Sequence, residues 1–126
     1  MTQEDKELLL KDLCARLPYM PKIKITYQQQ GIKGTDEGNV SCDAIEHIVN
    51  DLRNGVITDM QIYLRPMSSM TDEEKEKYHE LCDSYHGIYF DTIDSIDWLN
   101  AHHFDYRGLI PMGLAIEVTK GNNPYI

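Results

Sequence analysis

Proline and glycine residues interrupt the chain at short intervals, and this spacing limits what the chain can fold into. Pro18 and Pro21 follow one apolar segment, and Asn54, Gly55 and Pro66 bound another. Proline lacks a backbone donor and disfavours helix in the residue before it, whereas Asn-Gly favours a tight turn. The 126 residues are therefore expected to form several short helices and strands around one core.

The first third of the chain has two periodic segments. Leucines at helical spacing, after a possible N-cap at Thr2, predict a helix over residues 3–16. Alternation of apolar and polar residues predicts a half-buried strand over 22–30. The glycine-rich stretch that follows favours a hairpin whose second strand is residues 39–42.

The central part of the chain contains the strongest local signal. Residues 44–53 fit a short helix slightly better than a strand, and residues 56–64 alternate as a strand. Thr71 and Glu74 then form a Thr-x-x-Glu capping box, in which each residue satisfies a backbone amide at a helix start. This box predicts a helix that runs to about Tyr85 and ends at a glycine.

The last third adds a helix over residues 93–102 and a strand around residues 114–118. No linker and no internal repeat divides the chain. The sequence therefore predicts one α+β domain over residues 1–126, with a small antiparallel sheet of three to four strands packed against about three helices.

Negative charge is concentrated in one window of the chain. The net charge is −9, and residues 71–97 carry −7 of it through nine acidic and two basic residues. The acidic residues are Asp72, Glu73, Glu74, Glu76, Glu80, Asp83, Asp91, Asp94 and Asp97. Binding to nucleic acid or to anionic lipid depends on Lys and Arg, so we expect neither. A basic protein partner would suit this window.

The length of the apolar runs and the pattern of cysteines bear on the compartment of the protein. No stretch approaches the run of about 18 apolar residues that a membrane-spanning helix needs, and the first residues are polar. Cys14, Cys42 and Cys82 are an odd number without paired spacing, which is typical of reduced thiols. We therefore expect a cytoplasmic protein, and we expect no cofactor.

Two histidine-containing clusters are candidates for metal binding or catalysis. His79, Cys82 and His86 would lie on neighbouring positions of one helix if the helix reached that far, and their ligand types suit zinc. A packing role for Cys82 is the more common outcome, because cysteine is often buried without any chemical role.

The second cluster is His102, His103 and Asp105. Adjacent helical residues point about 100° apart, so the two histidines could bind one ion only if the helix had ended. Asp105 could orient a histidine, or it could hold a turn together with Arg107. We expect the structural role rather than catalysis, since acid–base chemistry needs partners that the sequence does not show.

Two longer motifs carry a resemblance to known proteins. They are Tyr63-Leu64-Arg65-Pro66-Met67-Ser68-Ser69-Met70-Thr71-Asp72-Glu73-Glu74-Lys75 and Asp97-Trp98-Leu99-Asn100-Ala101-His102-His103-Phe104-Asp105-Tyr106-Arg107-Gly108-Leu109-Ile110. With the first helix, they resemble a family of short proteins of Bacteroides-type gut bacteria, often from prophage-like or mobile regions. That family has no established activity, so the resemblance implies a bacterial or phage accessory protein and assigns no chemistry to any residue.

These observations favour a non-enzymatic interaction protein that binds a protein partner through an acidic helical surface. The residues expected to contact the partner are Asp72, Glu73, Glu76, Asn100, His102, His103, Asp105 and Arg107. One alternative is a small metal-dependent hydrolase or nuclease using His102, His103 and Asp105, with His79, Cys82 and His86 as a weaker metal site. Another is a structural protein that assembles with copies of itself.

Overall fold

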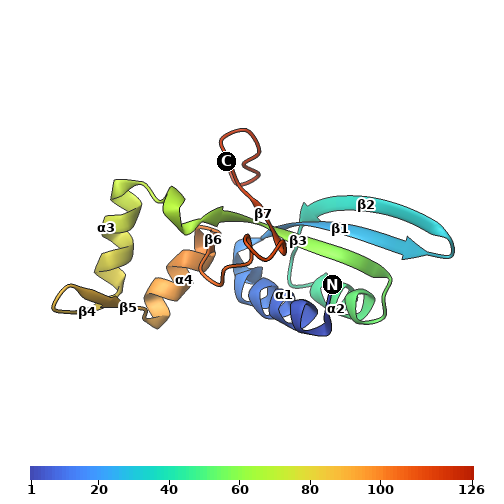
Figure 1. The fold of residues 1–126 in the computed structure, drawn as a ribbon, viewed down its shortest axis with the longest axis horizontal. Helices are drawn as coiled ribbons and strands as arrows, with labels where there is room; N and C mark the ends of the chain where they lie inside the picture. Colours follow the sequence, from blue (N-terminus) through green and yellow to red (C-terminus); the bar gives the residue numbers. More distant parts are fainter.

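The computed structural model describes residues 1–126 as an elongated molecule whose two ends are built differently (Figure 1). In chain order the elements are α1 (Gln3–Arg16), η1 (Leu17–Tyr19), β1 (Lys22–Gln29), β2 (Ile32–Asn39), α2 (Ile45–Arg53), β3 (Ile57–Pro66), η2 (Met67–Ser69), α3 (Asp72–Leu81), β4 (Asp83–Tyr85), β5 (Ile88–Phe90), α4 (Ile93–Ala101), β6 (Phe104–Asp105) and β7 (Ala115–Glu117). The predicted α+β class is confirmed. None of the helices combines the length and the apolar character that a bilayer span requires.

The larger sheet is built around β3. β1 pairs with both β2 and β3 in antiparallel orientation. β6 and β7 also pair with β3, both in parallel orientation, so the five-stranded sheet is mixed. The predicted antiparallel arrangement therefore holds for β1, β2 and β3 alone. β6 and β7 are two and three residues long, too short for alternation to reveal them.

The apolar core lies between this sheet and two helices. α1 and α2 cover one face of the sheet (Figure 1). The side chains that are fully buried there include Leu9, Leu13, Leu52, Met60, Ile62 and Leu64. The three residues from β3 are spaced by two, so they share the face that the helices cover. Burying each such side chain stabilises the fold by about 1.5–3 kcal/mol.

The first two elements match their predictions, but the hairpin after them differs. Gln30 and Gly31 have φ values of 52° and 79°, which makes a two-residue turn and starts β2 at Ile32 rather than at residue 39. Gly34 and Gly38, which were expected in the turn, lie inside the strand. A Cβ at Gly34 would lie 2.5 Å from the hydroxyl of Tyr27 on the paired strand, so a larger residue there would have to displace the Tyr27 side chain.

The capping box at Thr71 is confirmed, but α3 is shorter than expected. Thr71 accepts from the Glu74 amide, and the Glu74 side chain accepts from the Thr71 amide. The helix ends at Leu81 because Cys82 has extended backbone, with ψ of 155°. His86 and Gly87, with φ of 49° and 82°, then form the turn of a second hairpin, β4–β5, which the prediction of a helix to residue 85 excluded.

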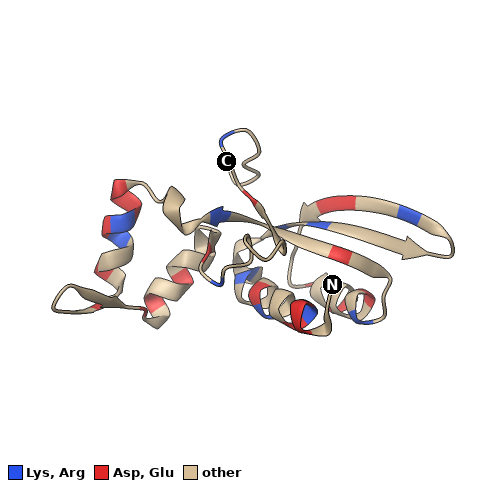
Figure 2. Ribbon diagram, in the orientation of Figure 1, with Lys and Arg blue, Asp and Glu red and all other residues tan.

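Residues 67–103 form a separate part of the molecule, here called the acidic lobe; the rest is called the body. The lobe comprises η2, α3, β4, β5 and α4 and contains nine acidic and two basic residues. Figure 2 shows these acids on both lobe helices. The chain leaves the body after β3 and returns in β6 directly beside it, where the Arg65 amide donates to the His103 carbonyl at 2.7 Å.

Candidate functional site

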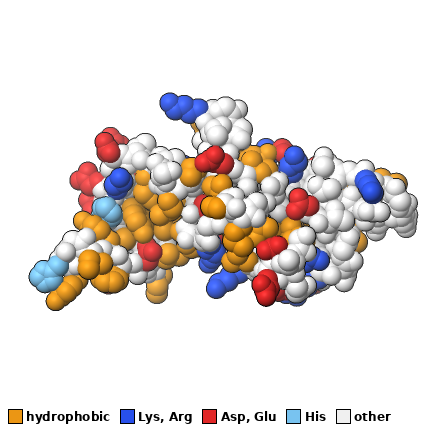
Figure 3. Space-filling view, in the orientation of Figure 1, with side chains coloured by type: hydrophobic (Ala, Val, Ile, Leu, Met, Phe, Trp, Pro, Cys, Tyr) orange, Lys and Arg blue, Asp and Glu red, His pale blue; other side chains and the backbone are white.

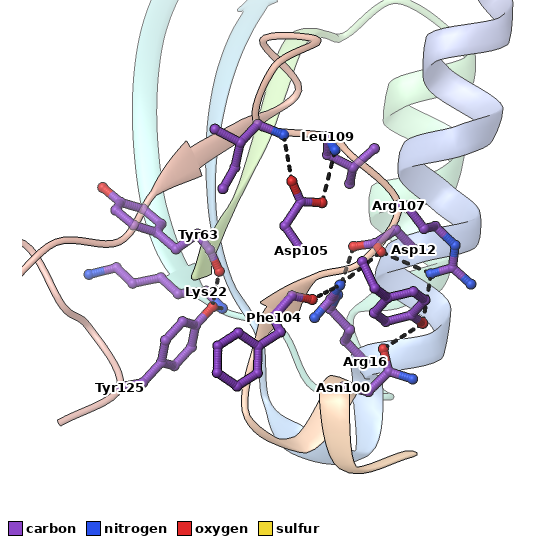
Figure 4. A network of polar contacts seen from close by, with 12 residues as sticks. Asp12, Arg16, Lys22, Tyr63, Asn100, Phe104, Asp105, Arg107, Leu109 and Tyr125 are labelled. Atoms are coloured by element: carbon purple, nitrogen blue, oxygen red, sulfur yellow. Dashed lines mark hydrogen bonds and ion pairs between the residues drawn. The ribbon is translucent and has the colours of Figure 1, made fainter. Parts of the chain in front are cut away.

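A buried ion network joins α1 to the segment that follows α4 (Figure 4). Asp12 is fully buried and accepts hydrogen bonds from Arg16 at 2.8 and 3.1 Å and from Arg107 at 2.9 Å. Arg16, also fully buried, donates to the Phe104 carbonyl at 2.7 Å. One carboxylate thus faces two guanidinium groups from segments far apart in sequence. Each partner satisfies groups that would be costly to bury alone.

Neighbouring side chains hold the turn after β6. Both carboxylate oxygens of Asp105 accept hydrogen bonds from backbone amides, one from Leu109 at 2.8 Å and one from Ile110 at 2.9 Å. The Tyr106 hydroxyl donates to the Asn100 side chain at 2.8 Å. The predicted turn at Asp105 is therefore present, but the carboxylate binds backbone amides rather than Arg107.

Most of the expected partner contacts between residues 100 and 107 are buried in or beside this network. The exposed fractions of Asn100, His103 and Asp105 are 3%, 9% and 8%. Arg107 is held by Asp12 and keeps 19% of its side chain exposed. These residues connect the acidic lobe to the body, and their burial does not support the prediction that they contact a partner.

His102 and His103 do not converge with Asp105 on a common site. His102 packs on the Trp98 ring at 4.4 Å between centroids, whereas His103 stacks on Tyr125 at 3.5 Å. Both Asp105 oxygens are occupied by backbone amides. Burial lowers the pKa of His102, and burial together with Arg16 lowers the pKa of His103 to about 4. Both rings are therefore neutral near pH 7.

The cluster of His79, Cys82 and His86 is also not assembled. The helix ends before Cys82, His79 stacks on the Tyr89 ring at 3.8 Å, and His86 lies in the β4–β5 turn against Tyr85. No group of three or more His, Cys, Asp or Glu side chains is placed to hold a metal ion. The weaker alternative of a zinc site required a helix that reached His86, and α3 ends at Leu81.

The acidic lobe is attached to the body by an ion pair and a line of aromatic rings. Arg65 donates two hydrogen bonds to Glu74, at 2.7 and 2.8 Å, and its guanidinium lies 4.2 Å from the Phe104 ring centroid. This pairing lowers the pKa of Glu74 to about 2. Trp98 lies between the rings of Tyr78 and Phe104 at 6.1 and 5.7 Å. These contacts fix α3 and α4 against β3.

The outer surface of α3 retains the other expected acidic contacts. Asp72, Glu73 and Glu76 are all exposed, and none has an ion-pair partner. Asp72 and Glu76 border a shallow groove that also includes His79 and Tyr89. These three acids are therefore accessible to a partner.

The β4–β5 hairpin places an apolar face in solvent, a feature that the sequence analysis missed. Tyr85, Ile88 and Phe90 share one side of the hairpin and are 67%, 56% and 54% exposed. The opposite side turns Tyr89 toward His79 of α3. Figure 3 shows apolar and histidine side chains gathered at this end of the molecule. The alternation on both sides of Gly87 is the signal that could have revealed it.

The apolar face continues onto the start of α4. Ile93 is 81% exposed, and it lines a groove between the hairpin base and α4. The residues around this groove are Asp83, Asp91, Thr92, Ile93, Ile96 and Asp97. We call the three hairpin residues Tyr85, Ile88 and Phe90, together with this groove, the docking surface.

Asp91 has a structural role inside this surface. Its Oδ1 accepts hydrogen bonds from the Tyr78 hydroxyl and from Ser95, which ties α3 to the start of α4. Burial and the Asp91 carboxylate together raise the pKa of Tyr78. Asp83 and Asp97 have no ion-pair partner in the chain, so the groove presents unneutralised carboxylates beside the exposed Ile93 and the half-buried Ile96.

Comparison of the chain with family models, with curated proteins and with solved structures finds no match. The resemblance to the Bacteroides-type family therefore stays a prediction.

Proposed function

We propose that this protein is a non-enzymatic interaction module that binds a basic, amphipathic segment of a protein partner on its docking surface. The observation that carries the proposal is the joining of an exposed apolar hairpin face to a groove lined by carboxylates. Lysine and arginine have apolar stems and cationic heads, so they fit such a surface in both respects.

The hairpin itself is an argument for a partner. An isolated two-stranded hairpin is marginally stable in water, and every residue of β4 and β5 is exposed. The contacts that hold it are the Tyr89–His79 stack and its two chain connections. A partner that covered Tyr85, Ile88 and Phe90 would remove apolar surface from water and stabilise the hairpin at the same time.

Charge selects the class of partner. The acidic lobe has a net charge of −7, so two copies of the lobe would repel each other and a basic segment would be attracted. Asp72, Glu73 and Glu76 on α3 extend the negative potential beyond the docking surface. Such charges raise the rate of encounter more than the final affinity, and salt weakens their effect.

Binding is favoured over catalysis by the positions of the polar groups. The histidines and Asp105 are separated and occupied by other contacts, whereas the docking surface offers shape and charge without an assembled acid–base pair. Cys14, Cys42 and Cys82 are free thiols. They support a reducing compartment, and we place the module in the cytoplasm for that reason.

The test uses affinity capture from nuclease-treated bacterial lysate, with the full chain as bait and two lobe variants. The apolar variant carries Ile88→Ser, Phe90→Ser and Ile93→Ser, and the charge variant carries Asp83→Asn, Asp94→Asn and Asp97→Asn. Matched controls change exposed residues of the body. They are Met20→Ser with Met112→Ser for the apolar variant, and Asp43→Asn, Glu46→Gln and Asp59→Asn for the charge variant.

The captured protein is then purified and its affinity is measured by titration calorimetry. We expect the apolar variant to lower the affinity by about 30-fold or more, as loss of central contacts does in other interfaces. The charge variant should weaken binding less and flatten its salt dependence, and both controls should bind like the parent. Equal retention by the parent and both lobe variants would exclude this surface.

A further inference from the structure

β2 is a free edge of the larger sheet. The two-residue turn makes Gln29 and Ile32 the closing pair of the β1–β2 hairpin, and hydrogen-bonded pairs recur at every second residue from there. Beyond the other end of the hairpin, the amide of Val40, also an even-numbered residue, donates to the Pro21 carbonyl at 2.8 Å. The even-numbered residues of β2 therefore direct their backbone groups toward β1.

The odd-numbered residues of β2 direct theirs outward. Lys33, Thr35 and Glu37 present their backbone N–H and C=O groups at the edge, and all three residues are exposed. Gly34 and Gly38 lie between and after them and carry no side chain that would obstruct a neighbour. An eight-residue edge strand with unpaired backbone N–H and C=O groups is a template on which another strand can pair.

We propose that β2 pairs with β2 of a second copy of this chain, antiparallel and about a two-fold axis at Thr35. Outward residues must pair with outward residues, and both odd-numbered and even-numbered residues of β2 allow such an axis. An axis at Thr35 sets Lys33 of each copy opposite Glu37 of the other, which is a favourable pair. An axis at Lys33, Asp36 or Glu37 would set like charges opposite each other. An axis at Gly34 would set Lys33 opposite Thr35 without a charge pair. Charge therefore favours the register about Thr35.

The same register fits an exposed isoleucine to a cavity. Ile32 is 66% exposed, and in this pairing it lies opposite Gly38 of the other copy on the face that the helices cover. A Cβ at Gly38 would meet no atom within 4 Å, because the glycine borders a cavity of about 170 Å³. The cavity is lined by Ile23, Ile25, Asp36, Glu37, Gly38, Asn39, Val40, Ala44 and Ile48. A cavity of ~150 Å³ in an apolar interior can hold a benzene molecule, so one isoleucine side chain fits.

Net charge does not oppose this contact. Residues 22–39 contain three lysines and two acids, whereas the acidic lobe lies at the opposite end of the molecule (Figures 1 and 2). Repulsion between distant lobes is screened over about 8 Å at physiological salt. This inference rests on β2 and its cavity, and it is independent of the proposed function of the lobe.

Sedimentation velocity across a range of concentrations gives the first test. We expect the parent to pass from monomer to dimer, with its mass doubling. Lys33→Glu and Glu37→Lys should each remain monomeric, because each sets like charges opposite each other. The double variant should dimerise again. Gly38→Val should also be monomeric, since it fills the cavity that receives Ile32.

A cysteine test reports the register and does not depend on affinity. In a background with Cys14, Cys42 and Cys82 changed to serine, Thr35→Cys should form an intermolecular disulfide on mild oxidation. Residues paired across such an axis have Cα atoms about 5.5 Å apart, inside the range for disulfides. Asp36→Cys is the matched control, because it lies opposite Gly34 and should crosslink much less.

Four outcomes would overturn the proposal, three of which concern β2 directly. These three are a monomer at every concentration, a dimer that survives Lys33→Glu, and stronger crosslinking at residue 36 than at residue 35. Loss of the dimer in the Ile88→Ser, Phe90→Ser, Ile93→Ser variant would also overturn it, because copies would then meet through the lobe. Circular dichroism of each variant shows that it is folded.

Discussion

The body and the acidic lobe of this protein are stabilised in opposite ways. The body buries nearly all of the apolar core, including every apolar side chain of β3 that faces α1 and α2. In the lobe, α3 and the β4–β5 hairpin contain no buried residue at all, and order there depends on caps, stacked rings and the Arg65–Glu74 pair. Few buried contacts have to break when such a region changes conformation. The lobe is therefore suited to rearrange when a partner binds to it.

Hydrogen exchange should show the largest difference between the two regions. Amides of Ile62 and Leu64, which face β7, are expected to exchange only on global unfolding, while hairpin amides open locally. We expect about four orders of magnitude between them, close to 5 kcal/mol, given the usual stability of a domain. Exchange measured by NMR or mass spectrometry at pH 7 tests this. Equal protection of the hairpin and β3 would contradict the division into two regions.

Breaking the joint between the regions should cost almost as much. Asp12→Ala leaves Arg16 and Arg107 close together without their shared carboxylate, and losing one member of a buried ion pair typically costs about 3–5 kcal/mol. Urea unfolding followed by circular dichroism measures this. Glu46→Ala, at an exposed acid on α2, is the control and should change stability little. A cost below 1 kcal/mol for Asp12→Ala would mean that the network is not a joint.

Acid should weaken the body at the same joint. The folded pKa of His103 is about 4 against an ordinary value of 6.5, so the unfolded chain binds a proton that the folded chain does not. Stability from this group is complete above pH 6.5 and falls as the pH drops to about 4, by roughly 3 kcal/mol in all. Arg16, Arg65 and His102 near the ring act in the same direction.

The variant His103→Asn tests this assignment. Asparagine tolerates the left-handed backbone at this position, where φ is 62°, and it does not titrate. We expect it to remove most of the slope of stability between pH 6.5 and pH 4. His47→Asn, at an exposed position on α2, should leave the slope unchanged. An unchanged slope in His103→Asn would assign the pH dependence to other groups.

The smallest effect is expected at the cap of α3. Thr71→Ala removes the hydroxyl that accepts from the Glu74 amide at 3.1 Å, a loss of about 1 kcal/mol in helix stability. Amides in α3 should exchange about five times faster, whereas those of β3 should not change. Thr71→Ser keeps the acceptor and should behave like the parent. Faster exchange in β3 as well would show that the two regions open together.

Local signals in the sequence were sufficient for the body helices and for the start of α3. Capping residues and apolar periodicity act within a few residues, so Thr2, Thr71 and the leucines of α1 could be interpreted without tertiary information. The extent of α3 could not. In the sequence, Gly87 fits both the end of a helix and the second residue of a hairpin turn. The structure has the hairpin turn, because the backbone is already extended at Cys82.

The candidate site was predictable only in part. The charge of the lobe is a property of composition, and Asp72, Glu73 and Glu76 remain accessible as expected. The network around Asp12 joins residues up to 95 positions apart, and no local pattern encodes such a pairing. The motif around Asn100 to Arg107 looked like a surface because it is polar, yet its polar groups satisfy one another inside the protein.

The place where the lobe leaves and rejoins the body has a further consequence. Because the chain departs after Arg65 and returns at Phe104 on the neighbouring strand, the segment between them is an insertion whose two ends meet. The turns that set the register of β1, β2 and β3 all precede it. Changes of length or sequence within α3 and the hairpin can therefore accumulate without shifting the main sheet, and new binding specificities can evolve in the insertion while the scaffold stays the same.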